Sequence, residues 1–137
     1  MAHVIAVAGK GGVGKTTLTG LIIQYLGEKG KGPILAVDAD ANSNLNEVLG
    51  VKVDATLGDV REEVARSEMA KDNPIPAGMT KADYMEFKFD DALVEDDDFD
   101  LLVMGRTQGK GCYCFVNGLL QAQIVLTTSL RIHMSSF

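Results

Sequence analysis

Short apolar runs alternate along the chain with segments whose apolar residues recur at helical spacing. Residues 4–8 form a run rich in β-branched side chains and bounded by glycine, which is typical of a strand buried on both faces. From Lys15 the spacing becomes helical, and the glycines of 27–32 end that pattern. A second apolar run at 33–37, ending at Asp38, completes a strand–loop–helix–strand unit. Such a unit predicts a parallel β-sheet.

The same spacings predict three further helices and a third buried strand. The helices are expected at 45–49, 57–69 and 84–94, and the strand at 99–104. In the last of these helices Phe87 and Phe89 alternate, so a strand remains the alternative there. The expected fold class is therefore α/β, with a mainly parallel sheet flanked by helices.

A glycine-rich loop joins the first strand to the first helix. It matches the pattern G-x-x-x-x-G-K-T and is extended by one threonine: Gly9, Lys10, Gly11, Gly12, Val13, Gly14, Lys15, Thr16 and Thr17. Glycines let successive N–H groups turn inward around an anion, and the helix adds its positive end. Lys15 is expected to contact the β- and γ-phosphates of ATP, and the Thr16 hydroxyl to bind Mg²⁺. An unrelated glycine-rich turn is the structural alternative.

Two aspartates follow the second strand, where ligands bind in open α/β sheets. A carboxylate at such a position can orient an attacking water or hold a magnesium-bound water. We assign Asp40 to water positioning, as a catalytic residue, and Asp38 to support near the metal. The alternative for either residue is that it only caps the next helix.

Composition limits the classes of partner. The 137 residues fit one domain spanning 1–137, with 46% hydrophobic and 23% charged residues. The net charge of −6 argues against a nucleic-acid partner, which needs a basic face. The sequence contains no apolar run near the roughly 20 residues that span a bilayer, and no basic leader precedes the first strand. We therefore expect a cytoplasmic protein with no nucleic-acid and no membrane partner.

The only two cysteines, Cys112 and Cys114, are separated by one residue. A reducing compartment keeps such thiols free, which favours metal or redox use over a disulfide. Two thiolates can face one centre but cannot complete a tetrahedral site, whereas a two-fold dimer would supply four sulfurs. Thiolates suit zinc, nickel, copper(I) or an iron–sulfur cluster. Incidental cysteines are the alternative, and His3 and His133 are the next candidate ligands.

Lys10 makes the phosphate loop more specific. With a lysine directly after the first glycine, the chain resembles the deviant P-loop class, which includes the nitrogenase iron protein, the septum-positioning and plasmid-partition ATPases and their metal-maturation relatives. That resemblance implies an ATP-dependent homodimer in which Lys10 reaches the phosphates of the opposite subunit, as an arginine finger in trans would. It also implies catalytic roles for Lys15 and for Asp40 in switch I. A merely solvated Lys10 is the alternative.

The segment Gly-Arg-Thr-Gln-Gly-Lys-Gly-Cys-Tyr-Cys at 105–114 adds a second resemblance. Together with the phosphate loop and the Asp-Ala-Asp of 38–40, it resembles the nickel-insertion accessory ATPases of carbon monoxide dehydrogenase and the related acetyl-CoA synthase maturation ATPases. The resemblance runs in matching order over 4–120. It implies Ni²⁺ or Zn²⁺ held by Cys112 and Cys114 at a dimer interface, and a nickel-containing client enzyme.

The resemblance stops near Leu120. In the family an acidic switch II follows the cysteines, yet residues 115–137 contain none of the 19 acidic residues of this chain. Residues 124–128 have the composition of a strand, whereas 129–137 match no family element. We therefore expect a chain cut short or shifted out of frame, with an incomplete sheet and an atypical tail at 121–137 that has poor order or non-native packing. A natural minimal form is the alternative.

Three other functions remain open at this point. The first is an iron–sulfur reductase gated by ATP, although the nitrogenase iron protein uses two separated cysteines per subunit. The second is a partition or positioning ATPase, which usually carries a basic tail; here the tail has only Arg131 and His133 as candidate cations. The third is a truncated ATP-binding fragment without catalysis.

Overall fold

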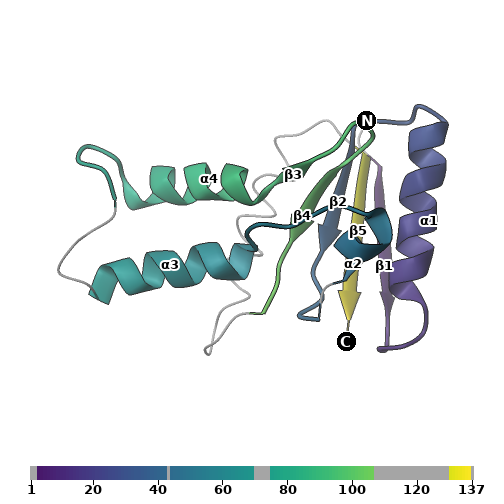
Figure 1. The fold of residues 1–137 in the computed structure, drawn as a ribbon, viewed down its shortest axis with the longest axis horizontal. Helices are drawn as coiled ribbons and strands as arrows, with labels where there is room; N and C mark the ends of the chain where they lie inside the picture. The colour runs from purple at the N-terminus through teal and green to yellow at the C-terminus, as the bar shows by residue number, and fades with distance from the viewer. Residues whose placement is uncertain (1–2, 43, 70–74, 107–129, 137) are drawn as a thin grey trace.

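The computed structural model describes residues 3–42, 44–69, 75–106 and 130–136 (Figure 1). In chain order its elements are β1 (Val4–Gly9), α1 (Lys15–Glu28), β2 (Ile34–Asp38), α2 (Leu45–Leu49), α3 (Leu57–Met69), α4 (Lys81–Ala92), β3 (Val94–Glu95), β4 (Asp100–Val103) and β5 (Leu130–Ser136). The predicted unit of strand, loop, helix and strand at the start of the chain is confirmed.

The strands form one mainly parallel sheet in the order β1-β5-β2-β4-β3. β5 is parallel to both of its neighbours, β1 and β2, and β2 is parallel to β4. Only β3, at the edge, runs antiparallel to its neighbour. The predicted α/β class is confirmed. Because β1, β2 and β4 run in the same direction, the loops that follow them meet at one end of the sheet.

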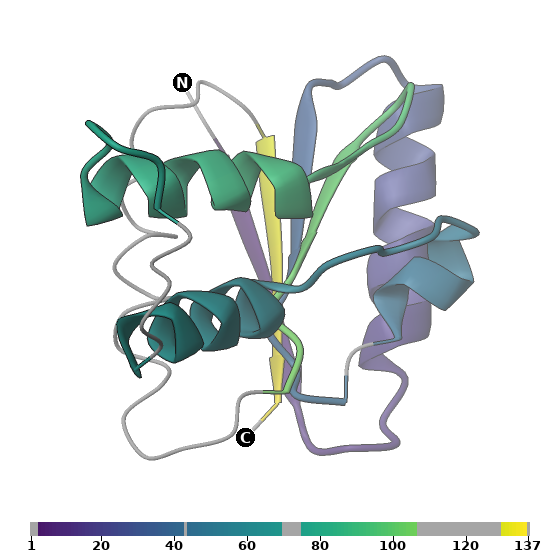
Figure 2. The same ribbon diagram turned by 60° about the vertical axis from the view of Figure 1, so that its left-hand side comes forward.

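β2 and β4 are buried on both faces because their side chains alternate between two apolar clusters. The first cluster joins one face to α3 and α4 through Val37, Leu57, Val60, Val64, Tyr84, Met85, Phe89, Ala92, Leu102 and Met104. The second joins the other face to α1 and α2 through Ile23, Ile34, Ala36, Leu45, Phe99, Leu101 and Val103. Figure 2 shows α1 and α2 together on their side of the strands. Each buried Val, Leu, Ile, Phe or Met side chain of these clusters stabilises the fold by roughly 1.5–3 kcal/mol relative to an exposed one.

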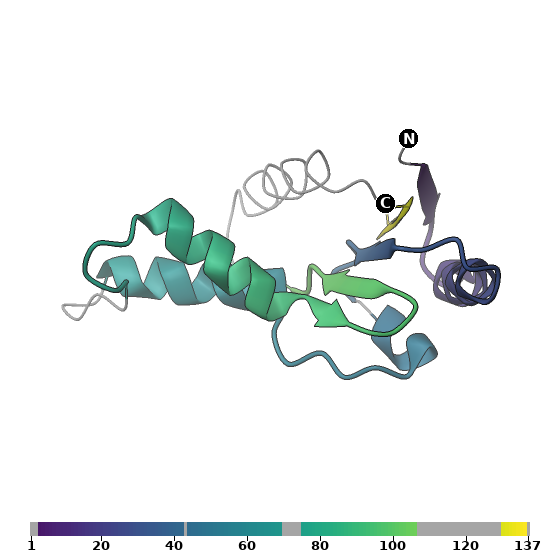
Figure 3. The same ribbon diagram turned by 90° about the horizontal axis from the view of Figure 1, so that it is seen from above.

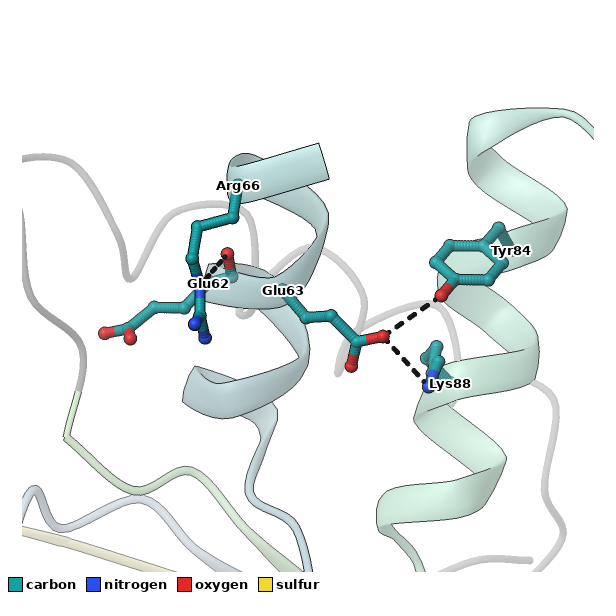
Figure 4. A network of polar contacts seen from close by, with 5 residues as sticks. All are labelled: Glu62, Glu63, Arg66, Tyr84 and Lys88. Carbon is teal, nitrogen blue, oxygen red and sulfur yellow. Dashed lines mark hydrogen bonds and ion pairs between the residues drawn. The ribbon is translucent and has the colours of Figure 1, made fainter. Parts of the chain in front are cut away.

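α3 and α4 lie side by side and extend away from the β3–β4 edge of the sheet, as the view from above shows (Figure 3). A polar network joins the two helices (Figure 4). The Glu63 carboxylate accepts a hydrogen bond from the Tyr84 hydroxyl and lies 3.1 Å from the Lys88 ammonium. Within α3, Arg66 Nε donates to the Glu62 carbonyl at 3.3 Å. These contacts join α3 to α4. The two helices, called the arm below, pack against the sheet through the first cluster.

The start of α4 corrects the prediction of a helix at 84–94. The helix begins at Lys81, because Thr80 and Asp83 form a capping box that satisfies the first amides. Phe89 is buried and Phe87 is 55% exposed, so the strand alternative at these residues is wrong. The helix ends earlier than predicted, and β3 then forms a short antiparallel pair with β4 that sequence analysis did not anticipate.

β1 is not buried on both faces, contrary to the prediction. Among the described strands it pairs only with β5, and alternate residues along it are exposed, with Val4 at 62%. Ile5, on the other face, packs against the cluster under α1. The apolar composition of β1 indicated a strand correctly but could not distinguish a central strand from an edge strand.

Residues 130–136 belong to the stretch for which we expected poor order or non-native packing. These residues form β5, which lies between β1 and β2 and pairs with both in parallel register. Their sequence alternates apolar with polar residues from Leu130 to Ser135, which is a strand pattern. The strand suggested at 124–128 lies outside the described residues.

Candidate functional site

Two glycines with positive φ shape the loop between β1 and α1. Gly12 and Gly14 have φ values of 79° and 88°, in the left-handed region that side chains disfavour. A β-carbon built on Gly11, Gly12 or Gly14 would meet no heavy atom within 4 Å. Glycine is therefore required here for the direction of the backbone, and the open space beside it has room for an anion.

The first turn of α1 presents its positive end to the same space. Gly14 is the N-cap residue and supplies no side-chain hydrogen bond, and the first turn contains no acidic side chain. The first amides of a helix have no partner within the helix, and they attract negative charge. The sequence around Gly14 thus leaves this helix start suited to a phosphate group.

Lys15 holds a positive charge over the loop. The residue is only 7% exposed, and its Nζ donates to the Lys10 carbonyl oxygen at 3.0 Å. An ammonium group has three N–H donors, so this contact fixes its place and leaves donors for phosphate oxygens. The predicted role of Lys15 is compatible with this geometry.

Thr16 connects the loop to the segment that follows β2. Its hydroxyl donates to Asn44 Oδ1 at 3.0 Å. A hydroxyl that gives its hydrogen to an amide oxygen keeps its lone pairs for another partner, such as a cation. Asn44 therefore orients the oxygen that sequence analysis assigned to magnesium.

A pocket of about 410 Å³ lies between the loop and the β2–α2 connection. Its lining residues are Gly11, Gly12, Gly14, Lys15, Thr16, Thr17, Asp40, Asn42 and Asn44. One wall offers an ammonium group and helix amides, which suit phosphate. The other offers a carboxylate and amide oxygens, the ligand type that Mg²⁺ prefers. The residues present thus fit a magnesium-bound nucleotide.

Asp38 accepts hydrogen bonds from the backbone of the β2–α2 connection and is not among the residues that line the pocket. It is fully buried, and its two carboxylate oxygens accept from the Asp40 amide at 3.1 Å and the Leu45 amide at 3.2 Å. Burial raises the pKa of this carboxyl, and the backbone hydrogen bonds oppose that rise. Because Leu45 begins α2, these contacts match the alternative in which Asp38 caps the next helix, and its role near the metal stays a prediction.

Asp40 lies at the pocket wall, where sequence analysis placed it. Its Oδ1 accepts from the backbone N–H of Asn42 at 3.0 Å. The side-chain Oδ1 of Asn42 accepts from the Arg106 guanidinium. The carboxylate is therefore held by its own loop and faces the same space as Lys15. This arrangement allows Asp40 to orient a water beside a bound phosphate.

The other predicted site residues are more remote or not described. Lys10 is exposed, and its side chain is not part of the pocket lining. Cys112 and Cys114 lie outside the described residues, so the structure does not test metal binding by them. His3 is exposed, and His133 lies in β5. Within residues 3–42, 44–69, 75–106 and 130–136, no group of three or more His, Cys, Asp or Glu could hold a metal.

A larger cavity, of about 480 Å³, opens at the opposite end of the sheet. It is lined by Gly27, Gly30, Gly32, Pro33, Ile34, Asp96, Asp97, Asp98, Phe99 and Asp100. Burial, and then the nearby Glu95 charge, raise the pKa of Asp100. Four carboxyl groups repel an anion, so size alone does not identify the nucleotide site.

Sequence reasoning missed three residues of the site. Sequence analysis gave no role to Asn42 or Asn44, and it used Arg106 only in the resemblance around the cysteines. Asparagine side chains often hydrogen-bond within turns, which is the one local signal that pointed to the first two. Arg106 carries no local signal, since its partner is 64 positions away.

The match to a family model covers nearly the whole chain. Residues 4–130 match the CobQ/CobB/MinD/ParA nucleotide binding domain. None of the helices in the described part of the chain is long and apolar enough to cross a membrane.

Three relatives are similar to this chain over most of its length. An uncharacterized ATP-binding protein of Methanocaldococcus jannaschii is 54% identical over 118 residues, which cover 86% of this chain and 46% of that protein. The carbon monoxide dehydrogenase accessory protein CooC of Rhodospirillum rubrum is 33% identical over 128 residues, covering 85% and 46%. A second uncharacterized ATP-binding protein of M. jannaschii is 31% identical over 127 residues, covering 85% and 49%. The chain thus spans about half the length of these relatives.

Proposed function

This chain belongs to the CobQ/CobB/MinD/ParA nucleotide-binding family, and we propose that it is an ATPase that uses the pocket beside Lys15 for MgATP. The observation that carries the proposal is the pairing of opposite chemistries across one pocket. Lys15 and the start of α1 attract phosphate, and Asp40 faces them from the β2–α2 connection. A site for phosphate binding alone would have no use for a carboxylate in that position.

Each polar group has a distinct role in this proposal. Lys15 binds the β- and γ-phosphates, and Thr16, oriented by Asn44, binds Mg²⁺. Mg²⁺ supplies charge neutralisation on the phosphate oxygens. Asp40 orients the attacking water, and Asp38 keeps the connection in place. Lys10, exposed on the loop, is available to a second subunit.

The proposed cellular role is that of a metallochaperone-type ATPase. Its support is the Cys112-Tyr113-Cys114 segment and the 33% identity to the accessory protein of carbon monoxide dehydrogenase. In this proposal two chains form a dimer around ATP, their four cysteines hold one Ni²⁺ or Zn²⁺, and hydrolysis releases the metal to a nickel-containing client enzyme in the cytoplasm.

A second candidate is a nucleotide-binding domain without turnover. It is favoured by the edge position of β1, which among the described strands pairs only with β5. This candidate keeps ATP binding and predicts no phosphate release.

Two measurements on the purified chain separate these candidates. Calorimetric titration with MgATP, followed by a phosphate-release assay, distinguishes binding with turnover from binding alone.

Lys10→Ala should bind ATP but should not dimerise with a slowly hydrolysed analogue in sedimentation. An unchanged dimer fraction and unchanged turnover in this variant would rule out the role of Lys10 in trans.

Metal stoichiometry tests the role of the cysteines. One Ni²⁺ or Zn²⁺ per two chains, lost in the Cys112→Ser/Cys114→Ser double variant with ATP binding intact, is the expected result. Acid should release the metal as the thiolates protonate. One metal per chain, or metal retained without the cysteines, would exclude the bridge and direct attention to His3 and His133.

A further inference from the structure

We propose that Arg106 is a positioning residue of the nucleotide site, which holds the β2–α2 connection through Asn42 and thereby keeps Asp40 at the pocket wall. The inference rests on the proposed nucleotide site for its functional part. Its structural part concerns contacts between residues that sequence analysis did not connect, since Arg106 and Asn42 are 64 positions apart.

The backbone immediately before Arg106 is fixed. The Met104 amide donates to the Asp38 carbonyl at 2.8 Å, and the Met104 carbonyl accepts from the Gly58 amide at 2.9 Å. Gly105 has a φ of 67°, and a β-carbon there would lie 2.4 Å from Thr56 Oγ1. Glycine is therefore required at 105, and the chain leaves β4 in one direction that brings Arg106 to the end of β2.

From this anchor a series of hydrogen bonds runs to the buried base of the connection. The Arg106 guanidinium donates to the side-chain Oδ1 of Asn42. The backbone N–H of Asn42 then donates to Asp40 Oδ1 at 3.0 Å. The Asp40 amide donates to Asp38 Oδ1 at 3.1 Å. Each member of the series holds the next, so that removal of Arg106 releases the outermost hold on the Asp40 loop.

The connection is held from two sides. Thr16 binds Asn44 from the side of α1, and Arg106 binds Asn42 from the side of β4. Asn42 and Asn44 both line the pocket, as Asp40 does. The Arg106 charge lies one hydrogen bond from the pocket wall, where it favours a ligand with more negative charge. We therefore expect Arg106 to favour ATP over ADP.

The test compares Arg106→Gln, Arg106→Lys, Asn42→Ala and the Arg106→Gln/Asn42→Ala double variant of the whole chain. Arg66→Gln is the matched control, because Arg66 is an exposed arginine on α3 (Figure 4) and is not among the residues that line the pocket. Hydrogen exchange of the nucleotide-free protein reports the amides of Asp40, Asn42 and Leu45. Calorimetry with MgATP and MgADP reports the affinity ratio.

In Arg106→Gln and in Asn42→Ala we expect the loop amides to exchange about tenfold faster, the size of one lost hydrogen bond to a charged group. The double variant should add no more, Arg106→Lys should restore part of the protection, and Arg66→Gln should change nothing. The ATP-to-ADP affinity ratio should fall by about the same factor in Arg106→Gln.

Unchanged exchange in Arg106→Gln, or additive effects in the double variant, would overturn the positioning role. An equal loss of ATP and ADP affinity would overturn the preference for the triphosphate. If the wild-type chain binds no nucleotide, the proposed function fails, and the exchange rates still decide whether Arg106 holds the loop.

Discussion

The two ends of the sheet each carry a cavity, and the larger one has the wrong charge for a nucleotide. The cavity at the amino ends of β2 and β4 measures about 480 Å³ and is walled by four aspartates. The cavity at the carboxyl end of β2 measures about 410 Å³ and contains Lys15, the start of α1 and a single carboxylate. A triphosphate would be repelled at the first and attracted at the second.

The difference shows that strand direction, not cavity size, locates the chemistry. Parallel strands place their following loops at one end, where loops from separate parts of the sequence can combine. Here the loop after β1 supplies Lys15, the connection after β2 supplies Asp40, and the chain after β4 supplies Arg106. At the other end, the cavity beside the acidic turn between β3 and β4 is otherwise lined by glycines and apolar residues.

The largest expected effect concerns catalysis at the carboxyl end. Asp40→Asn should lower the rate of ATP hydrolysis roughly 100-fold or more, because it removes the carboxylate that orients the attacking water. ATP affinity should change little. The matched change at the other end, Asp98→Asn, should leave both quantities unchanged in a phosphate-release assay and calorimetry. Equal turnover in the two variants would remove the distinction between the ends.

ATP affinity should depend on the carboxyl end of the sheet and not on the amino end. Lys15→Ala should weaken ATP binding by about 2–3 kcal/mol, since it removes a charge-assisted contact in a mostly buried place. Lys31→Ala removes an exposed lysine just before β2, near the other cavity, and should not alter affinity. Isothermal calorimetry of both variants decides, and equal affinities for wild type and Lys15→Ala would place the nucleotide elsewhere.

The two ends can also be compared through their buried acids. Burial raises the pKa of both Asp38 and Asp100 above the ordinary 3.8, so the folded state holds these protons more tightly than the unfolded chain. The stability that each carboxyl contributes is full below the unfolded pKa and is lost as pH rises through the folded pKa.

Asp38→Asn therefore loses the most stability, relative to wild type, at low pH. The deficit should be about 1–2 kcal/mol near pH 4, because the amide offers one acceptor for two backbone N–H groups, and it should shrink toward pH 7. Asp100→Asn should follow the same trend with a smaller change, since Asp100 is less buried. Urea unfolding at the two pH values measures both, and a deficit that grows with pH would contradict the raised pKa.

The smallest expected effect lies in the arm, away from both ends. Glu63→Gln should cost about 0.5–1 kcal/mol of stability, because it weakens partly exposed contacts with Tyr84 and Lys88. Glu86→Gln, on the exposed side of α4, serves as the control. Thermal unfolding of the two variants is the measurement, and ATP affinity should be the same in both. A loss of affinity in Glu63→Gln would show that the arm contributes to the site.

The sequence predicted those parts of the fold and site that depend on local pattern. β1, α1, β2 and the phosphate loop follow from short apolar runs, helical spacing and glycines. Lys15 and Thr16 were proposed from the loop motif and Asp40 from its place after the second strand, and all three line one pocket. The start of α4 was missed although Thr80 and Asp83 have the spacing of a capping box, so this error was avoidable.

Other features depend on contacts between distant residues and could not be predicted. An apolar run does not show how many neighbours a strand has, which is why β1 was expected to be buried. The place of β5 between β1 and β2 is set by pairing across more than 90 positions, as in Ile34 with Leu130. Asn44 and Arg106 entered the site in the same way, through partners 28 and 64 positions away.

The most direct test of the nucleotide site is a hydrogen-exchange footprint of the whole chain with and without MgATP. Amides of 11–17 and 40–45 should become protected, because phosphate and metal contacts order both walls of the Lys15 pocket. Amides of 96–100, at the acidic cavity, should exchange at the same rate in both samples. Protection at 96–100 with none at 11–17 would contradict the assignment of the nucleotide to the carboxyl end of the sheet.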